Sequence, residues 1–454
     1  MSATSLAAPP RRVTTVPVRQ VIPGVLRGPL QMVEEIGRRS GGDLTRLNLG
    51  TFRPYLVSRP EHIQHILRDN AAKYRREGLL WKPLSRLVGA PSGADPAWPL
   101  KKDAYFALLT APKVASYTED MATAIADAVD ELAERVPSGQ TADASIEFTR
   151  IVYRAILRIF VGDRLPLSRA DEFGAAMMTA AESSFRARLL FPYMPFWFPL
   201  PGDRAFHRAV GDIDDIILPL VQAARREESA GEDLVSTLLR ARGEDGRVLS
   251  DQEVRDGIVA LFLAGTETTV KALSYLWVVL DSHPEVANAL FAEIDQVVGQ
   301  GRPRAEHLPE LRYTRMVTHE LLRVFPPGWI LPRIAAEDDV LDGIRIKAGS
   351  IVVISPYLTH RSEAHWPDPL TFDPERFAPE RADRRHRFAY LPFGAGPHQC
   401  AGSLFFSVES QLIIASMVSR LRPELGNAGA VGVAADLTMR PSEPVALKLN
   451  PTRR

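Results

Sequence analysis

The segment from Asp251 to about Asp281 constrains the fold more than any other part of the chain. Its centre, Ile258 to Ala264, is apolar on every side of a helix. A helix with no polar face lies inside a protein, where neighbouring elements cover all of it. We therefore expect a long helix that crosses the interior and ends before His283-Pro284. The apolar centre is much shorter than the roughly 20 residues that cross a bilayer, which predicts no transmembrane anchor.

The remaining pattern is mostly helical, with a small β part. Apolar residues at three- and four-residue steps predict further helices at Met121–Val136, Ser145–Phe160, Arg208–Arg226, Pro284–Val298 and Tyr313–Val324, with a last one from just after Cys400 to about Leu421. Glu61–Leu67 is predicted to start a helix behind Pro60. Short runs of strand-forming residues predict strands at Asp43–Leu49, Tyr55–Val57, Ile344–Ile346 and Ile351–Ile354. We expect an N-terminal extension over 1–40, partly irregular, and one domain over 41–454 whose β-rich part is mainly 43–60 and 330–355 plus C-terminal strands.

Charge and cysteine content narrow the function. The chain has 454 residues, with 55 basic and 55 acidic side chains, so it lacks the basic excess of a general nucleic-acid binder. Its one cysteine excludes an internal disulfide and a four-cysteine zinc site. Met1 to Arg12 has no apolar signal core. These features predict a soluble protein of a reducing compartment, the cytoplasm.

The segment Phe191–Pro201 interrupts the helical pattern. It holds four prolines, which exclude a regular helix, and five aromatic residues, which are unusual in a solvated loop. Packing beneath a helix pair, a lid over an apolar pocket and contact with a membrane surface are all compatible with this composition.

The single cysteine lies in Phe393-Gly394-Ala395-Gly396-Pro397-His398-Gln399-Cys400-Ala401-Gly402. Gly396 permits a turn where a Cβ would clash, and Pro397 stiffens the approach to Cys400. At the start of a helix, backbone N–H groups and the helix dipole stabilise a thiolate. Gly402 allows that helix to approach a flat group closely. A thiolate beside a planar group is typical of an axial ligand to haem iron, whereas a buried, inert cysteine is the ordinary alternative.

This segment resembles the haem-binding signature of the cytochrome P-450 superfamily, Phe-x-x-Gly-x-(Arg/His)-x-Cys-x-Gly. Three further motifs of that family precede this segment, in the order that the family has them. Ala264-Gly265-Thr266-Glu267-Thr268 is similar to the family's oxygen-binding motif, and Glu320-Leu321-Leu322-Arg323 is similar to its Glu-x-x-Arg motif. Pro374-Glu375-Arg376-Phe377 is similar to its Pro-Glu-Arg-Phe element. The resemblance spans about Arg255–Gly402. It implies a mostly helical cytochrome P-450 fold, with haem between the long interior helix and the Cys400 loop.

The resemblance also implies an activity. A haem-thiolate monooxygenase of the soluble bacterial type carries haem b, uses dioxygen as co-substrate, and receives electrons from NAD(P)H through a ferredoxin-type donor and its reductase. The family's pattern assigns Thr268 a hydrogen bond to dioxygen and Glu267 the supply of protons from solvent. A structural cap or a buried polar pair is the alternative for these two residues. A threonine hydroxyl bonded to a carbonyl one turn earlier can also distort a helix.

Haem carboxylates need cationic donors. The resemblance assigns this role to His398 and Arg333. The family's third donor, from a Trp-x-x-x-Arg helix, has only Trp98 and Lys102 as candidates, and Lys102 lacks the planar fork of an arginine. Pro99 is compatible only with the first turn of a helix.

Glu320 and Arg323 are expected to pair on one helix face. A pair removed from water needs a further partner, which the family supplies from Arg376 or its loop. A zinc-binding helix at His319-Glu320 is excluded, because Arg323 stands where the second histidine is needed.

The family's substrate pocket maps to apolar residues, which predict a hydrophobic small-molecule substrate of terpenoid, fatty-acyl or polyketide type: Leu261, Phe262, Ala264, Trp329, Ile330, Leu331, Trp81 and Phe191. Core packing is the alternative for these side chains. An acidic ferredoxin is expected to dock near Arg384, Arg385 and Arg387, with Lys101 and Lys113 as further candidates.

Two other functions remain open at this point. The same haem chemistry can perform desaturation, coupling or successive oxidations. A protein that only binds a haem ligand, without turnover, is the alternative from a different class. The presence of both Glu267 and Thr268 favours the activation of dioxygen.

Overall fold

The computed structural model describes residues 13–50, 52–77, 81–89, 95–183, 187–188, 191, 194–227, 231–382 and 385–451. Its contacts divide the chain into two compact units, each assembled from three separate segments. The sheet unit comprises Met1–Gly78, Gly328–Leu370 and Arg384–Gln399. The helical unit comprises Leu79–Pro327, Thr371–Asp383 and Cys400–Arg454.

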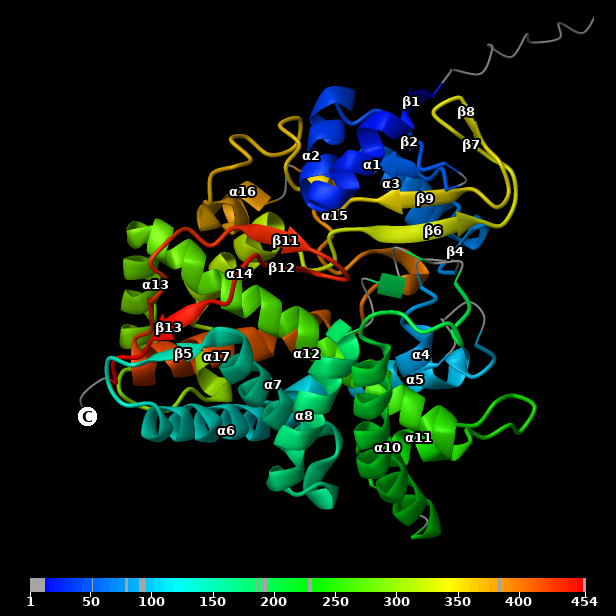
Figure 1. Cartoon of the computed structure of the whole chain (residues 1–454). Coiled ribbons are helices and arrows are strands. Elements are labelled where there is room, and N and C mark those ends of the chain that lie inside the picture. Colours follow the sequence, from blue (N-terminus) through cyan, green and yellow to red (C-terminus); the bar gives the residue numbers. More distant parts are fainter. Residues whose placement is uncertain are drawn as a thin grey trace, which may run out of the picture. The chain divides into compact units, whose positions relative to one another are not determined.

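The sheet unit is built on a six-stranded sheet (Figure 1). Its strands lie in the order β1-β2-β3-β9-β6-β4, with bounds Thr14–Val16, Thr45–Leu47, Tyr55–Val57, Ile351–Ile354, Leu331–Ala335 and Tyr74–Arg75. Strand β3 pairs with β9 in parallel, in a register that places Leu56 opposite Val353. Strands distant in the sequence therefore meet at the centre of this sheet.

Other elements of the sheet unit surround these strands. They are α1 (Val18–Arg27), α2 (Pro29–Ser40), α3 (Pro60–Gln64) with the π turn His65–Asp69, the hairpin β7–β8 (Asp339–Leu341 and Ile344–Ile346) and α15 (Pro356–Thr359). The unit's core is made of buried side chains that include Val57, Ile63, Ile66 and Ile354. Val57 and Ile354 are opposite one another on β3 and β9, and their burial together helps to select this register.

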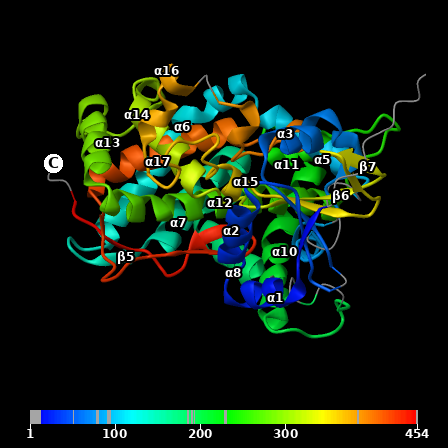
Figure 2. The same ribbon diagram turned by 90° about the horizontal axis from the view of Figure 1, so that it is seen from above.

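The helical unit holds most of the helices, both long and short (Figures 1 and 2). They are α4 (Ser85–Val88), α5 (Trp98–Leu108), α6 (Ala111–Arg135), α7 (Ala144–Phe160), α8 (Leu167–Ser183), α10 (Asp203–Arg226), α11 (Leu234–Arg240), α12 (Asp251–Ser282), α13 (Pro284–Val297), α14 (Arg312–Val324), α16 (Pro379–Ala382) and α17 (Ser403–Leu421). Short sheets complete the unit: β10-β13-β5 (Glu424–Leu425, Ala446–Lys448, Thr141–Asp143) and the hairpin β11–β12 (Val433–Ala435, Met439–Pro441).

Helix α12 crosses the middle of the helical unit, as the sequence predicts (Figure 2). It packs against α4, α7, α10, α11, α13 and α17. A capping box at Ser250 and Glu253 starts it, because each residue binds the other's backbone N–H. It ends where Pro284 begins the next helix.

Helix α17 is also a core helix. In the part of the chain that the structure describes, it is the one helix whose length and composition would be enough to cross a membrane. Its most apolar window is 78% buried inside the protein, however, as in the core helix of a folded domain.

The prediction of a mostly helical fold with a small β part is confirmed. The strands at Tyr55–Val57, Ile344–Ile346 and Ile351–Ile354 have the predicted bounds. The chain before Asp43 is more regular than expected, since it contributes β1, α1 and α2. Strand β1 forms because Thr14–Val16 pairs with Thr45–Leu47, a partner that local sequence does not indicate.

Candidate active site

Cys400 lies just before helix α17 in the helical unit, and its thiol is exposed. The helix begins at Ser403, and its first backbone hydrogen bond runs from Phe406 N–H to the Gly402 carbonyl at 2.8 Å. A Cβ added at Gly402 would lie 3.7 Å from the Cys400 sulfur. The glycine therefore leaves one side of the thiol open at the start of a helix.

The loop that leads to Cys400 belongs to the sheet unit. Gly396 has φ +73°, and a Cβ there would lie 1.7 Å from the carbonyl oxygen of Leu67. Only glycine fits, because both the positive φ and the close backbone exclude a side chain. Gly396–His398 then forms one turn of 3-10 helix, while Phe393 is half-buried. The predicted role of Gly396 as a turn that a Cβ would block agrees with this geometry.

One face of α12 is more exposed than the rest of this core helix. Leu261, Ala264, Gly265 and Thr268 are half-buried or exposed, although α12 is buried on both sides of them. Their spacing places them along one stripe of the helix. A Cβ at Gly265 would lie 3.3 Å from Ile156 of α7, so the glycine also permits close packing there. The stripe is a smooth surface of small and apolar groups on which a flat molecule can lie.

Two threonine hydroxyls bind carbonyls one turn earlier along this segment. Thr268 Oγ1 donates to the Ala264 carbonyl and Thr269 Oγ1 to the Gly265 carbonyl, both at 2.8 Å. The helix nevertheless continues as a regular α-helix through these residues. The Thr268 contact is of the kind that the sequence suggests, and the described helix is not interrupted by it.

The carboxyl group of Glu267 contacts Thr438, near the C-terminal end of the chain. Its Oε1 accepts a hydrogen bond from Thr438 Oγ1 at 2.9 Å. Burial raises the pKa of Glu267, while the Thr438 hydrogen bond and nearby Lys271 act in the opposite direction. Glu267 thus has the higher proton affinity that suits a group that stores and passes on protons.

Glu320 and Arg323 form a fully buried ion pair on α14. Arg323 donates two hydrogen bonds of 2.7 Å to the two oxygens of Glu320, and both residues are 0% exposed. Arg323 also donates to the Thr371 carbonyl, and Asp373 N–H donates to Glu320. Arg376 completes the cluster, with Nε 3.4 Å from Glu320. This geometry agrees with the predicted structural role of the three residues.

The neighbouring His319 has a packing role. Its ring stacks on Phe377, with centroids 5.3 Å apart. Burial, aided by Arg315, lowers the pKa of His319 to about 4, so the ring is neutral at physiological pH. The structure thus gives this ring a packing contact on Phe377.

Arg333 lies on β6 of the sheet unit and is 5% exposed. Its one hydrogen bond within the described residues goes to the Pro332 carbonyl, at 2.9 Å. Burial and the nearby Arg76 lower the pKa of Arg333 to about 10. A buried guanidinium without a carboxylate partner in the described structure suits an anionic ligand. His398 lies in the same unit and is half-buried.

These features meet the chemical requirements of haem in each unit separately. The helical unit supplies an exposed thiol and the smooth stripe of α12, and the sheet unit supplies a buried cation for a propionate. The chemistry of Cys400, Ala264, Gly265 and Arg333 therefore fits a haem group.

Trp98 and Lys102 lie on α5, which begins at Trp98 with Pro99 in its first turn, as the sequence predicts. Trp98 packs edge-to-face on Tyr105. The Lys102 ammonium lies over the ring of Phe106, 5.7 Å from its centre. The described contacts thus place Lys102 on an aromatic ring, and its role toward a haem carboxylate stays a prediction.

One residue of the expected substrate pocket is a core residue. Phe262 is 0% exposed, and its ring stacks on Tyr153 of α7 and meets Phe173 of α8 edge-on. A side chain enclosed by two helices does not line an open pocket, so this assignment is corrected. Sequence reasoning missed it because the partners of Phe262 are distant in the chain.

The other pocket candidates divide between the units. Leu261 and Trp81 are half-buried in the helical unit. Trp329 is buried in the sheet unit, where Ile330 and Leu331 are half-buried and Leu331 lies 3.9 Å from the Cβ position of Gly394. Phe191 is 52% exposed.

The aromatic segment is irregular and exposed over its described residues, Phe191 and 194–201. Trp197 is 82% exposed. Buried Arg188 holds the segment by donating to the carbonyls of Pro195, Phe196 and Phe198 and by pairing with Asp203. Packing beneath a helix pair is excluded for Trp197 by this exposure.

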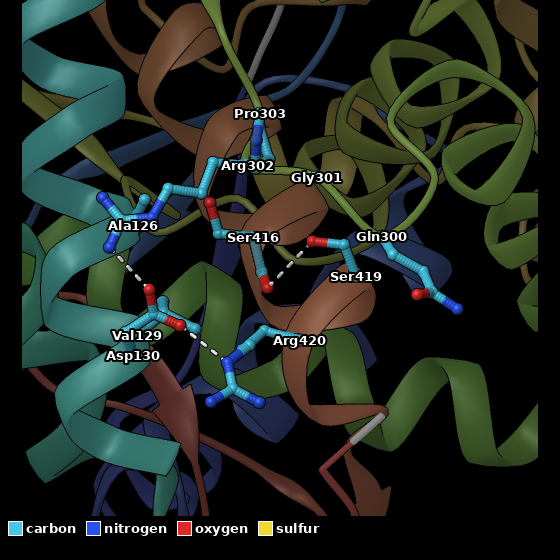
Figure 3. A pocket seen from close by; sticks show the side chains of 10 residues that line it. All are labelled: Ala126, Val129, Asp130, Gln300, Gly301, Arg302, Pro303, Ser416, Ser419 and Arg420. Carbon is cyan, nitrogen blue, oxygen red and sulfur yellow. Dashed lines mark hydrogen bonds and ion pairs between the residues drawn. The ribbon is translucent and has the colours of Figure 1, made fainter. Parts of the chain in front are cut away.

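A separate small pocket lies between α6, α17 and the segment Gln300–Pro303 (Figure 3). Asp130 is flanked there by Arg302 and Arg420, each at 2.6 Å. The pocket has a volume of about 30 Å³, which is enough to hold a water molecule. None of the sequence-predicted site residues lines this pocket.

Three contacts near the site were not indicated by sequence reasoning. Glu409 of α17 accepts a hydrogen bond from Thr269, Thr438 binds Glu267, and Asp203 binds Arg188. Glu409 is the one acidic residue in a mostly apolar helix, which is a signal that the sequence does contain.

An exposed cysteine before a helix, a core helix with a stripe of small and apolar residues, and a buried arginine are each compatible with the haem-thiolate class of proteins. Comparison with known families agrees with this class. The family model "Cytochrome P450" matches residues 10–448, and the chain belongs to the cytochrome P450 family. The protein is a cytochrome P450 monooxygenase.

Bacterial relatives match nearly the whole chain. Cyclooctat-9-en-7-ol 5-monooxygenase of Streptomyces melanosporofaciens is 32% identical over 433 residues, with 92% of each chain covered. Cyclooctatin synthase of the same organism is 33% identical, with 87% of this chain and 86% of the relative covered. Pentalenene oxygenase of Streptomyces avermitilis is 28% identical, with 92% of this chain and 90% of the relative covered.

The fold of this chain is also similar to that of a solved cytochrome P450 structure. The crystal structure of the cytochrome P450DA heme domain superposes with a TM-score of 0.85, covering 98% of each chain at 20% sequence identity. This similarity supports the cytochrome P450 fold with its mostly helical architecture and small sheets.

Proposed function

We propose that the protein inserts one oxygen atom from dioxygen into a lipophilic, terpenoid-like small molecule. The observation that carries this proposal is the stripe of small and apolar residues on α12, in the same unit as the exposed thiol of Cys400. Haem, when bound to a cysteine thiolate, supplies the electron-rich iron that favours O–O cleavage.

Six residues are proposed to hold the haem. Cys400 would provide the sulfur ligand, Gly402 would leave space beside it, and Ala264 and Gly265 would present a surface without bulky side chains. Arg333 provides a desolvated cation for a propionate, with His398 as a second donor in the same unit. The pair of Glu320 and Arg323 stabilises the segment before this loop by binding the backbone at Thr371 and Asp373.

Thr268 and Glu267 are proposed to handle protons. The Thr268 hydroxyl donates its hydrogen to the Ala264 carbonyl, which fixes its orientation. Its oxygen can then accept a hydrogen bond from another donor. Glu267 is adjacent, with a pKa raised by burial. This acid and hydroxyl pair favours oxygen activation over simple ligand carriage.

The substrate class rests on two observations. Leu261 and Ala264 are apolar and accessible on the α12 stripe, and apolar walls orient a lipophilic molecule through few polar contacts. The names of the relatives denote an alkene, pentalenene, and an alkenol, cyclooctat-9-en-7-ol. We therefore favour a terpenoid over a fatty-acyl or polyketide substrate.

An acidic ferredoxin-type protein is proposed as electron donor. Arg387 is exposed, and Arg385 lies with its guanidinium 4.4 Å from the centre of the Trp366 ring. Arg384 lies outside the described residues. Lys101 is removed from the predicted set, because it is 4% exposed and paired with Asp95 at 2.9 Å. Lys113 is paired with Glu232.

Arg387→Glu is expected to slow reduction without changing substrate binding, whereas Arg345→Glu, at an exposed site on β8, serves as the control.

The proposed reaction is tested with isotope-labelled dioxygen. The purified holoprotein, supplied with a surrogate ferredoxin and its reductase, is incubated with a panel of terpene hydrocarbons and alcohols. One labelled oxygen atom in the product is the expected result. Label absent from every product, or products that differ from substrate only by loss of hydrogen, would favour desaturation or coupling instead.

A further inference from the structure

The carboxyl group of Glu267 is held by a hydroxyl from the C-terminal part of the chain. Thr438 Oγ1 donates to Glu267 Oε1 at 2.9 Å, and Thr438 is 9% exposed. Thr438 lies in the turn between β11 and β12, and β12 packs against α12. The local structure of α12 does not need this hydrogen bond, because Thr438 comes from a distant part of the chain.

The turn that presents Thr438 is fixed on both sides. The backbone N–H of Asp436 donates to the Thr438 carbonyl, and Met439 N–H donates to the Pro327 carbonyl, both at 3.0 Å. These bonds hold the backbone of the turn, so that the Thr438 hydroxyl occupies a defined position.

The charged groups around Glu267 are engaged elsewhere. Lys271, one turn further along α12, pairs with Glu182 of α8 at 2.9 Å. Asp436 pairs with Arg440 within the hairpin at 3.0 Å. On the α7 side, Tyr153 is buried and its pKa is raised by that burial. Glu267 therefore lacks an arginine or lysine ion-pair partner among the described residues, and Thr438 is its hydrogen-bond donor there.

We propose that Thr438 is a positioning residue for Glu267, through which the C-terminal hairpin orients the carboxyl group beside Thr268. This inference rests on the proposed role of Glu267. The carboxyl accepts one proton from the solvent side and gives one up toward the Thr268 side, so its charge is restored after each transfer. A fixed orientation keeps the second transfer directed, because proton transfer requires hydrogen-bond geometry.

The hydroxyl also sets the proton affinity of Glu267. Burial is the largest influence on its pKa and raises it, and the hydrogen bond from Thr438 is the strongest influence that lowers it. Removal of that bond is therefore expected to raise the pKa further. A hydrogen bond to an ionised group corresponds to about one pKa unit.

The test compares three variants of the haem-loaded full chain. Thr438→Val removes the hydroxyl while keeping the shape, and Thr438→Ser keeps the hydroxyl. Thr118→Val is the matched control, because Thr118 is 4% exposed and its hydroxyl binds only a backbone carbonyl on α6. Infrared difference spectra across a pH series follow the carboxyl band of Glu267, which is assigned by its loss in Glu267→Gln.

We expect the titration midpoint of Glu267 to rise by about one pH unit in Thr438→Val. The midpoint should remain at the wild-type value in Thr438→Ser and in Thr118→Val. In turnover with the surrogate donor, Thr438→Val should release several-fold more hydrogen peroxide per dioxygen consumed, and the serine should restore coupling. A wild-type midpoint and wild-type coupling in Thr438→Val would overturn the proposal.

Failure of the proposed function gives a different signature. The absorption of the reduced carbonyl adduct reports the haem ligand in wild type and variants alike. An adduct without thiolate character in the wild type would contradict the proposed haem-thiolate function. The infrared titration measures the contact between Thr438 and Glu267 whatever the haem ligand is, and so it decides the positioning proposal separately.

Discussion

Thr269 of α12 and Glu409 of α17 are joined by a hydrogen bond, with Thr269 Oγ1 3.3 Å from Glu409 Oε2. Glu409 is 0% exposed, and no described group donates to its other oxygen. Burial raises the pKa of Glu409 to about 8, and the Thr269 hydrogen bond only partly offsets that rise. The two central helices of the helical unit are therefore linked through a carboxylic acid that is protonated at neutral pH.

The raised pKa of Glu409 makes stability depend on pH. An unfolded glutamate ionises near 4.5, whereas folded Glu409 keeps its proton to about 8. Between these values the unfolded state binds fewer protons, so the free energy of unfolding falls as pH rises, by about 1.4 kcal/mol per unit. The total reaches roughly 5 kcal/mol at pH 8 and above.

Glu409→Gln is expected to remove most of this slope, since an amide can bind Thr269 without ionising. Urea unfolding of the wild type and the variant at pH 6 and pH 8 measures it. Glu424→Gln, at an exposed position on β10, should keep the wild-type slope. An unchanged slope in Glu409→Gln would show that another group causes the pH dependence.

The pair of Glu320 and Arg323 predicts strong coupling between two mutations. Arg323→Ala leaves Glu320 as a buried charge without its main partner, at a cost of about 3–5 kcal/mol in the free energy of unfolding. Arg323→Lys keeps the charge but loses the two parallel hydrogen bonds, and so should cost less. In urea unfolding, the double variant Glu320→Ala/Arg323→Ala should be more stable than the sum of the single effects predicts. Additive effects would mean that the pair does not act as a unit.

Arg333 predicts opposite effects on the apoprotein and on haem retention. Its pKa is lowered to about 10, so it remains charged at pH 7 and the folded apoprotein carries a desolvation cost of about 3 kcal/mol. Arg333→Met should raise the free energy of unfolding of the apoprotein by about 2 kcal/mol. The same change should speed haem transfer to an apoglobin about tenfold, a loss of about 1.4 kcal/mol in binding.

Arg345→Met is the control for this prediction, because Arg345 is exposed and pairs with Asp338. It should leave both haem transfer and stability close to wild type. Haem transfer from Arg333→Met at the wild-type rate would contradict the assignment of Arg333 to a haem carboxylate.

Local sequence patterns predicted the elements that carry the site. The bounds of α12 follow from its apolar centre and from His283-Pro284, and the turn at Gly396 follows from the glycine and proline of its motif. In each case the determining feature is either a short-range signal or a motif with fixed spacing. The four motifs, taken together, also indicated the family.

The contacts that sequence reasoning missed join distant segments. Phe262, for example, packs on Tyr153 of α7 and Phe173 of α8. The ion pair of Lys101 with Asp95 is local by contrast, but Asp95 lies in the irregular segment before α5, outside any helical pattern. No periodicity within a helix identifies such partners. Helix amphipathicity shows which face is buried but not whether its neighbour is a ligand or another helix.

The ligation of haem by Cys400 is tested most directly by the absorption of the reduced carbonyl adduct in the wild type, Cys400→Ala and Cys400→His. The account predicts thiolate-type absorption in the wild type, loss of that absorption in both variants, and a histidine-type spectrum in any haem retained by Cys400→His. A wild-type adduct that absorbs like a histidine-ligated globin, or thiolate-type absorption that survives Cys400→Ala, would contradict it.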